Sequence, residues 1–279
     1  MKNIILVPTD FSEVCTEAIN YGAHLAKKLN ASLAIVHILN RESVAKLNNP
    51  KLPEVEIQKI LSEISLQIRT KHGIEVETIY REGSIYTTIT EISSEIGAKL
   101  LVLGTHGKVG VQQQLIGSFA HKVVSRSNVP VIIMQEGVLF NEGIKRIVFP
   151  VSSTSQVRQK VNWAVQIAKT FSAKIYLFKF PEVLKETRFE MNVVVKQITD
   201  EFDKNDIEYE IHDAEKGGNY ASQVLVFAKT IHSELIMIMS NPDKLSFIFS
   251  QYDEQIMFNK NKIPSMLINP RELVIYHWY

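Results

Sequence analysis

The sequence predicts an α/β protein built from two tandem, doubly wound domains, each with a five-stranded parallel sheet and helices on both faces. Three observations support this fold class. Short apolar runs alternate along the chain with longer segments that carry apolar residues at helical spacing. The apolar runs are mostly continuous, which is typical of strands buried on both faces. Finally, the pattern of the first half begins again near residue 146.

The composition is that of a globular protein with a substantial core. Hydrophobic residues make up 45% and charged residues 22% of the 279 residues, a length that suits two domains. The formal net charge is +1 and no basic block is present, so we do not expect nucleic-acid binding. The single cysteine, Cys15, excludes an intramolecular disulfide, and its place in an apolar helical stripe favours a small core residue.

The sequence also bears on targeting. The apolar run at the N-terminus is too short for the core of a signal peptide, and no run is long enough to cross a membrane. We therefore expect a cytoplasmic protein without membrane association.

The first half alternates strands and helices. Ile4–Val7 is a buried strand that stops at Pro8-Thr9-Asp10, and Ser12 is placed to cap the helix that follows. Further strands are expected at Leu33–Leu39, Ile74–Tyr80, Leu100–Leu103 and from Val129, with helices between them and a loop over residues 40–53. Such an order is typical of a parallel sheet with helices on both faces.

The second half repeats the first. Arg146–Pro150 matches Ile4–Pro8 at an offset of 142 residues, and at the same offset Leu29 falls on Phe171. We interpret the repeat as the duplication of a whole domain. The predicted boundaries are residues 1–134 for the first domain, 135–145 for a linker, 146–270 for the second domain and 271–279 for an aromatic C-terminal tail.

A glycine-rich loop follows the strand Leu100–Leu103. Its glycines have the spacing Gly104-x2-Gly107-x9-Gly117-Ser118, and we expect a helix to start at Gly117. Unpaired amides and the helix dipole hold anions at such a start, so the segment is a candidate site for the phosphates of a nucleotide. Asp10 follows a neighbouring strand, where it can bind ribose or a magnesium ion or, alternatively, cap the next turn.

These segments resemble the universal stress protein family in its tandem, two-domain form. The resemblance rests on Ile5–Ser12, on Val36-His37-Ile38 and on the glycine pattern followed by Val129-Pro130-Val131, and this glycine pattern resembles that of the ATP-binding branch. It implies a Rossmann-like fold of the adenine nucleotide alpha hydrolase type. It also implies that ATP, or AMP or ADP, binds the first domain together with Mg²⁺.

The resemblance further implies individual roles. Asp10 contacts the ribose, the backbone of Ile38 meets the adenine edge, and Gly104 lies against the ribose. Other residues line the base pocket (Pro8, Thr9, Leu103) or hold phosphates through their amides (Gly107, Gly117, Ser118, Phe119). Independently of the resemblance, the place of His106 in the loop makes it a candidate for contact with phosphate or a metal, and Lys108 is either close to the phosphates or a solvated loop lysine. Family members commonly pair through the strand at Val129, which implies pairing of the two halves, and we also expect a homodimer and an unidentified protein partner.

The second half departs from this pattern where the ligand would bind. Ser152 replaces Asp10, and the loop after Ile238 contains no glycine. We therefore predict that the second half keeps the fold without binding ATP by this route. On this interpretation, Gly104, Gly107 and Gly117 are required by the ligand.

The favoured function is an ATP-binding sensor or signalling module in the stress response. One alternative is a slow metal-dependent ATPase that uses Asp10, and another is an interaction protein with a structural nucleotide. We assign no catalytic residue and no set of metal ligands, because the sequence has neither the Lys-Ser/Thr of a P-loop nor a His/Asp/Ser constellation of suitable spacing.

Overall fold

The computed structural model describes residues 3–40, 54–105, 113–138, 143–152, 159–182, 184–240 and 250–270, and of residues 113–119 it describes the backbone alone. The predicted C-terminal tail, residues 271–279, lies outside the described residues.

The described residues form strands and helices in alternation. The strands of the first half are β1 (Ile4–Pro8), β2 (Ser32–Leu39), β3 (Val76–Glu82), β4 (Leu100–Thr105) and β5 (Val131–Gln135). Those of the second half are β6 (Arg146–Val151), β7 (Lys174–Lys179), β8 (Tyr209–Asp213), β9 (Leu235–Met239) and β10 (Ser265–Ile268). The helices are α1 (Glu13–Lys28), α3 (Glu54–His72), α4 (Ile85–Glu95), α5 (Gln113–Arg126), α6 (Val161–Phe171), α7 (Lys185–Lys204), α8 (Tyr220–Thr230) and α9 (Gln251–Met257).

Helix α1 illustrates how the local sequence specifies these elements. The Ser12 hydroxyl accepts a hydrogen bond from the amide of Cys15, which caps the first turn. Glu13 lies at the positive end of the helix dipole, and Lys27 and Lys28 lie at the negative end. Cys15 is buried on the apolar face of the helix, and burial raises the pKa of its thiol to about 12. Its predicted role as a core residue is confirmed.

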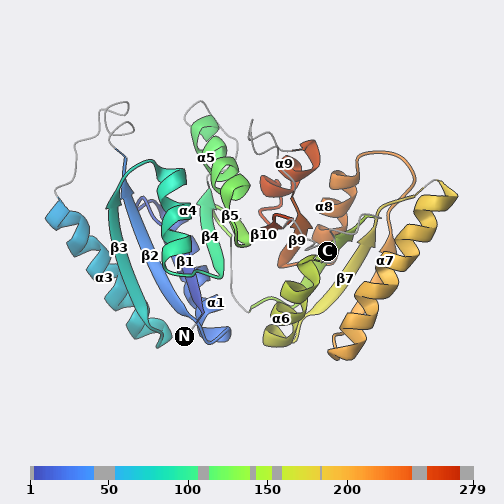
Figure 1. The fold of residues 1–279 in the computed structure, drawn as a ribbon, viewed down its shortest axis with the longest axis horizontal. Coiled ribbons are helices and arrows are strands. Elements are labelled where there is room, and N and C mark those ends of the chain that lie inside the picture. The colour runs from blue at the N-terminus through green and yellow to red at the C-terminus, as the bar shows by residue number, and fades with distance from the viewer. Residues whose placement is uncertain are drawn as a thin grey trace, which may run out of the picture.

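The strands form one continuous sheet rather than two. Its order is β3-β2-β1-β4-β5-β10-β9-β6-β7-β8 (Figure 1). Outward from the junction of β5 and β10, the strands of the two halves therefore follow in the same order. Neighbouring strands are parallel within each half, as predicted. The two halves meet where β5 and β10 pair antiparallel, with Ile132 opposite Met266. The predicted pairing of the halves is thus confirmed.

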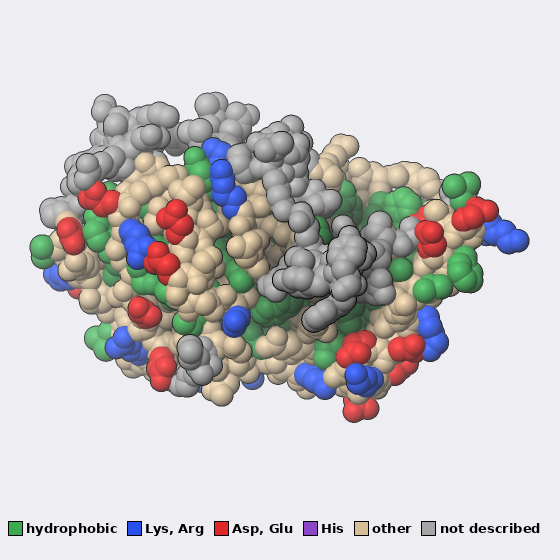
Figure 2. All heavy atoms as spheres, viewed as in Figure 1, with side chains coloured by type: hydrophobic (Ala, Val, Ile, Leu, Met, Phe, Trp, Pro, Cys, Tyr) green, Lys and Arg blue, Asp and Glu red, His purple; other side chains and the backbone are tan. Residues whose placement is uncertain are grey.

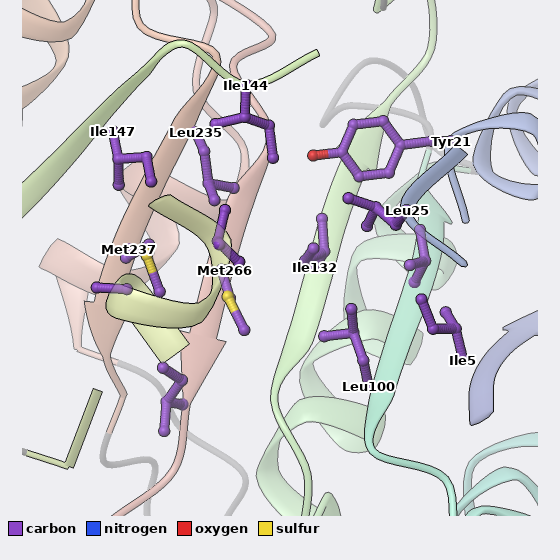
Figure 3. Close-up of a cluster of buried hydrophobic side chains, with 14 of the residues drawn as sticks. Ile5, Tyr21, Leu25, Leu100, Ile132, Ile144, Ile147, Leu235, Met237 and Met266 are labelled. Atoms are coloured by element: carbon purple, nitrogen blue, oxygen red, sulfur yellow. The ribbon is translucent and has the colours of Figure 1, made fainter. Parts of the chain in front are cut away.

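The two halves also share their hydrophobic core. One buried cluster contains α1 and α3 together with α6 and α7, while a second contains α4 and α5 together with α8 and α9. Each face of the sheet therefore carries helices from both halves. Figure 3 shows Ile132 and Met266 at the centre of the first cluster, between side chains such as Leu100 and Leu235.

Polar contacts fix the junction of the halves. The Gln135 amide donates to the carbonyl of Asn259 at 2.7 Å, and both residues are buried. The Asn269 amide donates to the carbonyl of Ser127 at 3.1 Å. Because these donors and acceptors come from different halves, they select one arrangement of the junction as well as stabilising it.

The surface matches the small net charge. On the face seen in Figure 2, basic and acidic side chains are interspersed. Among the described residues, no helix combines the length and the apolar character that crossing a membrane requires.

The shared core predicts that the halves unfold together. Ile132→Ala removes a fully buried side chain at the junction, and we expect it to lower the free energy of unfolding by about 2–5 kcal/mol. Urea denaturation followed by circular dichroism should still show a single transition. Leu66→Ala, at an exposed position of α3, is the control and should change the stability by less than about 0.5 kcal/mol. Two resolved transitions, with only one of them shifted, would contradict a shared core.

Candidate functional site

The strand order reverses between β1 and β4. From β1 the chain adds β2 and β3 on one side, then crosses back to place β4 on the other side. β1 and β4 are paired only at Ile5–Leu100 and Leu6–Leu101, so the two strands separate toward their carboxyl ends. Ligands of open parallel sheets bind in the crevice beyond such a point.

A strained turn follows β1 at the mouth of this crevice. Phe11 adopts a left-handed backbone conformation with φ of 68°, which is unfavourable for a bulky residue. Two side chains hold the turn: the Thr9 hydroxyl accepts from the Phe11 amide at 3.0 Å, and the Asp10 carboxylate accepts from the Ser12 amide at 2.9 Å. Backbone strain of this kind is concentrated at functional sites.

Asp10 has the turn-capping role considered from the sequence and also remains accessible to solvent. Its carboxylate braces the turn through Ser12, yet the residue is exposed to solvent at the crevice. Burial of part of the carboxyl group opposes ionisation, but hydrogen bonds from Ser12 outweigh this effect and hold the pKa below its ordinary value. Asp10 is therefore an anchored, ionised carboxylate with access to a ligand.

The backbone of Ile38 faces the crevice. In β2, the Ser32 amide donates to Asn3 on the β1 side and the Leu33 amide donates to Glu75 on the β3 side. Because this direction alternates along the strand, the main-chain groups of Ile38 point to the β1 side. β1 ends at Pro8, which pairs with Val36, so Ile38 extends past the end of its neighbour. A polar backbone edge is thereby presented to the crevice.

His37 supports this edge from the opposite face of β2. Its Nδ1–H donates to the carbonyl of Thr9 at 2.8 Å, and its ring stacks on Phe11 with centroids 4.4 Å apart. Burial lowers the pKa of His37. The expected hydrogen bond of His37 is confirmed, although the side chain is half-buried rather than in the core. The contact with Thr9 takes up the carbonyl that would otherwise extend the β1–β2 ladder.

Gly104 has a packing role that the sequence interpretation did not include. A Cβ at this position would lie 2.6 Å from the carbonyl oxygen of Val14, in the first turn of α1. No side chain fits at that distance, so β4 and α1 can approach this closely only with glycine. The interpretation of Gly104 purely as a ligand requirement was therefore incomplete.

The phosphate-binding segment is described in part. His106, Gly107 and Lys108 lie outside the described residues. α5 begins at Gln113, which places Gly117, Ser118 and Phe119 in its second turn. The prediction that the helix starts at Gly117 was wrong by four residues, and the unpaired amides of the first turn belong to residues 113–116.

The remaining predicted residues surround the same edge. Thr9 and Leu103 are buried, Pro8 is half-buried at the end of β1, and Ile38 is buried near the end of β2. The structure thus brings six predicted residues to the carboxyl ends of three adjacent strands: Pro8, Thr9, Asp10, Ile38, Leu103 and Gly104.

In the second half, the helix start carries its own carboxylate. Pro130 matches Pro264, and at this offset Gly117 and Ser118 fall on Gln251 and Tyr252. α9 begins there, capped by the Ser250 hydroxyl, which accepts from the Asp253 amide at 3.1 Å. The buried Asp253 carboxylate in turn accepts from the Ser240 hydroxyl at 3.2 Å. Burial raises the pKa of Asp253 to about 6, although these hydrogen bonds oppose the shift.

A buried lysine spans the separated strands of the second half. Lys160 is 1% exposed and aligns with Ala18 of the first half. Its side-chain nitrogen donates to the carbonyl of Met237 at 3.0 Å and also to that of Pro150. Both carbonyls lie beyond Val148–Ile236, the last pair that joins β6 to β9. Lys160 therefore satisfies main-chain groups that the separation of these strands leaves without a ladder partner.

Aromatic side chains fill the neighbouring space. Tyr220 stacks on Phe178 with centroids 5.9 Å apart and on Tyr252 with centroids 5.6 Å apart. The Tyr220 hydroxyl donates to the carbonyl of Phe178 at 2.6 Å. Tyr252 occupies the position that Ser118 has in the first half. Rings and a lysine side chain thus occupy the second crevice, and Asp253 lies at the helix start beside it.

Sequence reasoning missed Lys160 and Asp253. Lys160 could have been noticed because it is a charged residue among apolar ones and aligns with an alanine of the other half. Asp253 could have been noticed because it forms a Ser-x-x-Asp capping pattern with Ser250. Within the described ranges, no group of three or more His, Cys, Asp and Glu side chains is arranged to hold a metal ion.

Comparisons with known proteins agree with this architecture. The sequence model of the universal stress protein family matches residues 1–135. Universal stress protein YxiE of Bacillus subtilis is 32% identical over 149 residues, which cover 48% of this chain and 100% of that protein. Universal stress protein MJ0531 of Methanocaldococcus jannaschii is 28% identical over 140 residues, which cover 47% of this chain and 81% of that protein. A universal stress protein structure from Archaeoglobus fulgidus superposes with a TM-score of 0.76 at 18% identity, covering 97% of this chain and 100% of that chain, which shows a shared fold.

The contact at Gly104 predicts a stability effect that needs no ligand. Gly104→Ala forces a Cβ against the carbonyl of Val14, and we expect a loss of about 1–3 kcal/mol in the free energy of unfolding, measured without nucleotide. Leu103→Met, one position earlier in β4, is the control and should cost less than about 1.5 kcal/mol. An alanine variant as stable as the parent would show that ligand binding alone accounts for this glycine.

Lys160 predicts a dependence of stability on pH. Burial lowers the pKa of Lys160 well below its ordinary value, so folding releases a proton at any pH between the folded-state and unfolded-state values. Stability should therefore rise with pH between the folded-state pKa and the ordinary lysine pKa of the unfolded chain, by up to about 1.4 kcal/mol per pH unit. Urea denaturation at several pH values should show this slope in the parent and a reduced slope in Lys160→Met. Equal slopes in the two proteins would rule out this titration.

Proposed function

Since the chain belongs to the universal stress protein family, we propose that its first half binds an adenine nucleotide and acts as a nucleotide-dependent sensor or signalling module. The ligand is ATP, or its products ADP and AMP. The observation that carries this proposal is the backbone edge of Ile38, which extends past the paired end of β1, beside an anchored Asp10 carboxylate at the reversal of strand order.

Each part of a nucleotide has a chemical counterpart in the first crevice. The donor and acceptor groups of the Ile38 backbone suit the hydrogen-bonding edge of adenine, with Pro8, Thr9 and Leu103 around the base. The ionised carboxylate of Asp10 suits the ribose hydroxyls, close to Gly104. These residues fit the ligand because a fixed, charged acceptor and an open backbone edge lie at the same end of the sheet.

The phosphates belong beyond β4 in this proposal. The amides of Gly107, Gly117, Ser118 and Phe119 would hold them, with His106 and Lys108 nearby, and the start of α5 would add its positive potential. A divalent cation such as Mg²⁺ would neutralise phosphate charge. Gly117 and Ser118 lie in the second turn of α5, so contact through their amides requires the first turn to open when the nucleotide binds.

We further propose that one chain binds one nucleotide. In the second half, Lys160 donates to the carbonyls of the separated strands, and the carboxylate of Asp253 lies at the start of α9. The amide of Phe180, which aligns with Ile38, donates to the carbonyl of Val151 at 2.8 Å, so this edge is already paired within the chain. A polyanionic ligand would also be repelled by Asp253 and would need to displace these side chains.

The same structure bears on self-association. The edge of β5 is already paired with β10 inside the chain. A homodimer would therefore need a surface other than the strand through which the family commonly pairs. The outermost strands, β3 and β8, are the remaining edges of the described sheet.

Asp10→Ala tests the proposed ribose contact. The variant should bind ATP at least about tenfold more weakly than the parent, because it removes a charged acceptor from two hydroxyl groups. Isothermal titration calorimetry measures this change. Ser152→Ala alters the equivalent position of the second half and is the matched control, with unchanged affinity and stoichiometry. Equal ATP affinity in the parent and in Asp10→Ala would contradict the proposed site.

A further inference from the structure

A small cleft lies between the two halves at the amino-terminal ends of β1 and β4, opposite the candidate nucleotide site. It has a volume of about 140 Å³. Ile5 and Leu100 form its floor, Leu29 and Trp163 form its walls, and Asn3 and Lys99 lie at its rim. Trp163 belongs to α6, which also contributes Gln166 to the lining, whereas the other five residues and Ala31 belong to the first half.

The duplication shows what fills the equivalent place in the second half. Ile5 and Leu100 correspond to Ile147 and Leu235, which pair in the same register. Leu29 corresponds to the larger Phe171, and Trp163 corresponds to Tyr21 of α1, which is fully buried. The cluster in Figure 3 contains Tyr21 and Leu235, and also Ile144 from the segment that joins the halves.

The joining segment plugs this second place. Ile144 is fully buried, and a Cβ at Gly143 would lie 3.1 Å from the ring of Phe171. A single chain has one such segment, so it can fill only one of the two related positions. Among the described residues, no isoleucine or other side chain takes the corresponding place above Leu100, and the cleft remains.

The two rims differ in how their charged groups are paired, because Glu234 at the filled position also forms an ion pair with the guanidinium of Arg146. In the second half, the Glu234 carboxylate accepts from the amide of Lys145 at 3.2 Å and from that of Arg146 at 2.8 Å. It thereby holds the backbone of the plug. Lys99 stands in place of Glu234 at the open cleft and makes no ion pair with any described residue. Lys99 can therefore pair with a ligand that carries an anionic acceptor, whereas Glu234 accepts hydrogen bonds from the joining segment itself.

We propose that this cleft binds a small carboxylate with an apolar body about the size of one side chain. The body takes the place that Ile144 has in the second half, and the carboxylate pairs with Lys99. A cavity of about 150 Å³ with apolar walls holds one benzene ring, so the volume suits a ring or a short branched chain. An aromatic body also gains from stacking on the indole of Trp163.

Benzoate is the probe for this site. The chain has two tryptophans, Trp163 and Trp278, so the Trp278→Phe background leaves Trp163 as the only tryptophan reporter. Titration of benzoate should change Trp163 fluorescence with saturation and a Kd on the order of 1 mM. Benzylammonium, which has a similar body and the opposite charge, should bind at least about threefold more weakly.

Two substitutions assign the binding to this cleft. Lys99→Met should weaken benzoate about 3- to 5-fold and leave the neutral benzyl alcohol unchanged. Leu29→Phe copies Phe171 and should abolish binding of both molecules, while thermal denaturation verifies that the variant is folded. Lys59→Met, on the exposed surface of α3, is the matched control. The proposal is overturned if no saturable change occurs, if benzylammonium binds as tightly as benzoate, or if benzoate binds Lys99→Met and Leu29→Phe as it binds the parent.

Discussion

The antiparallel pairing of β5 with β10 is the constraint on which the rest of the structure depends. It joins two parallel sheets into one and places the helices of both halves over common faces. Buried contacts between Gln135 and Asn259 keep the junction in one register. Each half thereby buries the edge strand that would otherwise be open to other chains. Because the core is shared, each half also contributes to the stability of the other.

The two halves solve the same structural problem in different ways. A doubly wound sheet separates where its strand order reverses, and the backbone groups there need partners. The second half provides its own partners, a lysine that donates to two carbonyls and a serine hydroxyl that caps a helix start. The first half has Ala18 where the second has Lys160, and it leaves the edge of Ile38 open. An open edge is useful only if a ligand completes it.

Much of this fold follows from local patterns. The continuous apolar runs identified the strands, and the repeated Val-Pro-type strand ends identified the duplication, because both depend on residues close in sequence. The pairing of the halves came from the family resemblance, since nothing local distinguishes one neighbour of β5 from another. The meeting of Pro8, Ile38 and Gly104 at one edge followed from the rule that parallel strands end together.

Other features depend on contacts between distant residues and could not be predicted in this way. The role of Gly104 requires the position of the Val14 carbonyl, about 90 residues away in sequence. The start of α5 was placed too late because glycine suggested a boundary, whereas the structure extends the helix through it. Lys160 was missed because a buried amine becomes favourable only when two strands supply carbonyls. The plug at Ile144 depends on the path of a segment that looked like an ordinary linker.

The central claim is that duplication left one half with an open nucleotide site and closed the other with its own side chains. Native mass spectrometry of the intact chain with added ATP and Mg²⁺ tests it most directly, because it counts ligands on each molecule. The account predicts one nucleotide per chain at saturation. Two nucleotides per chain, or none, would contradict it.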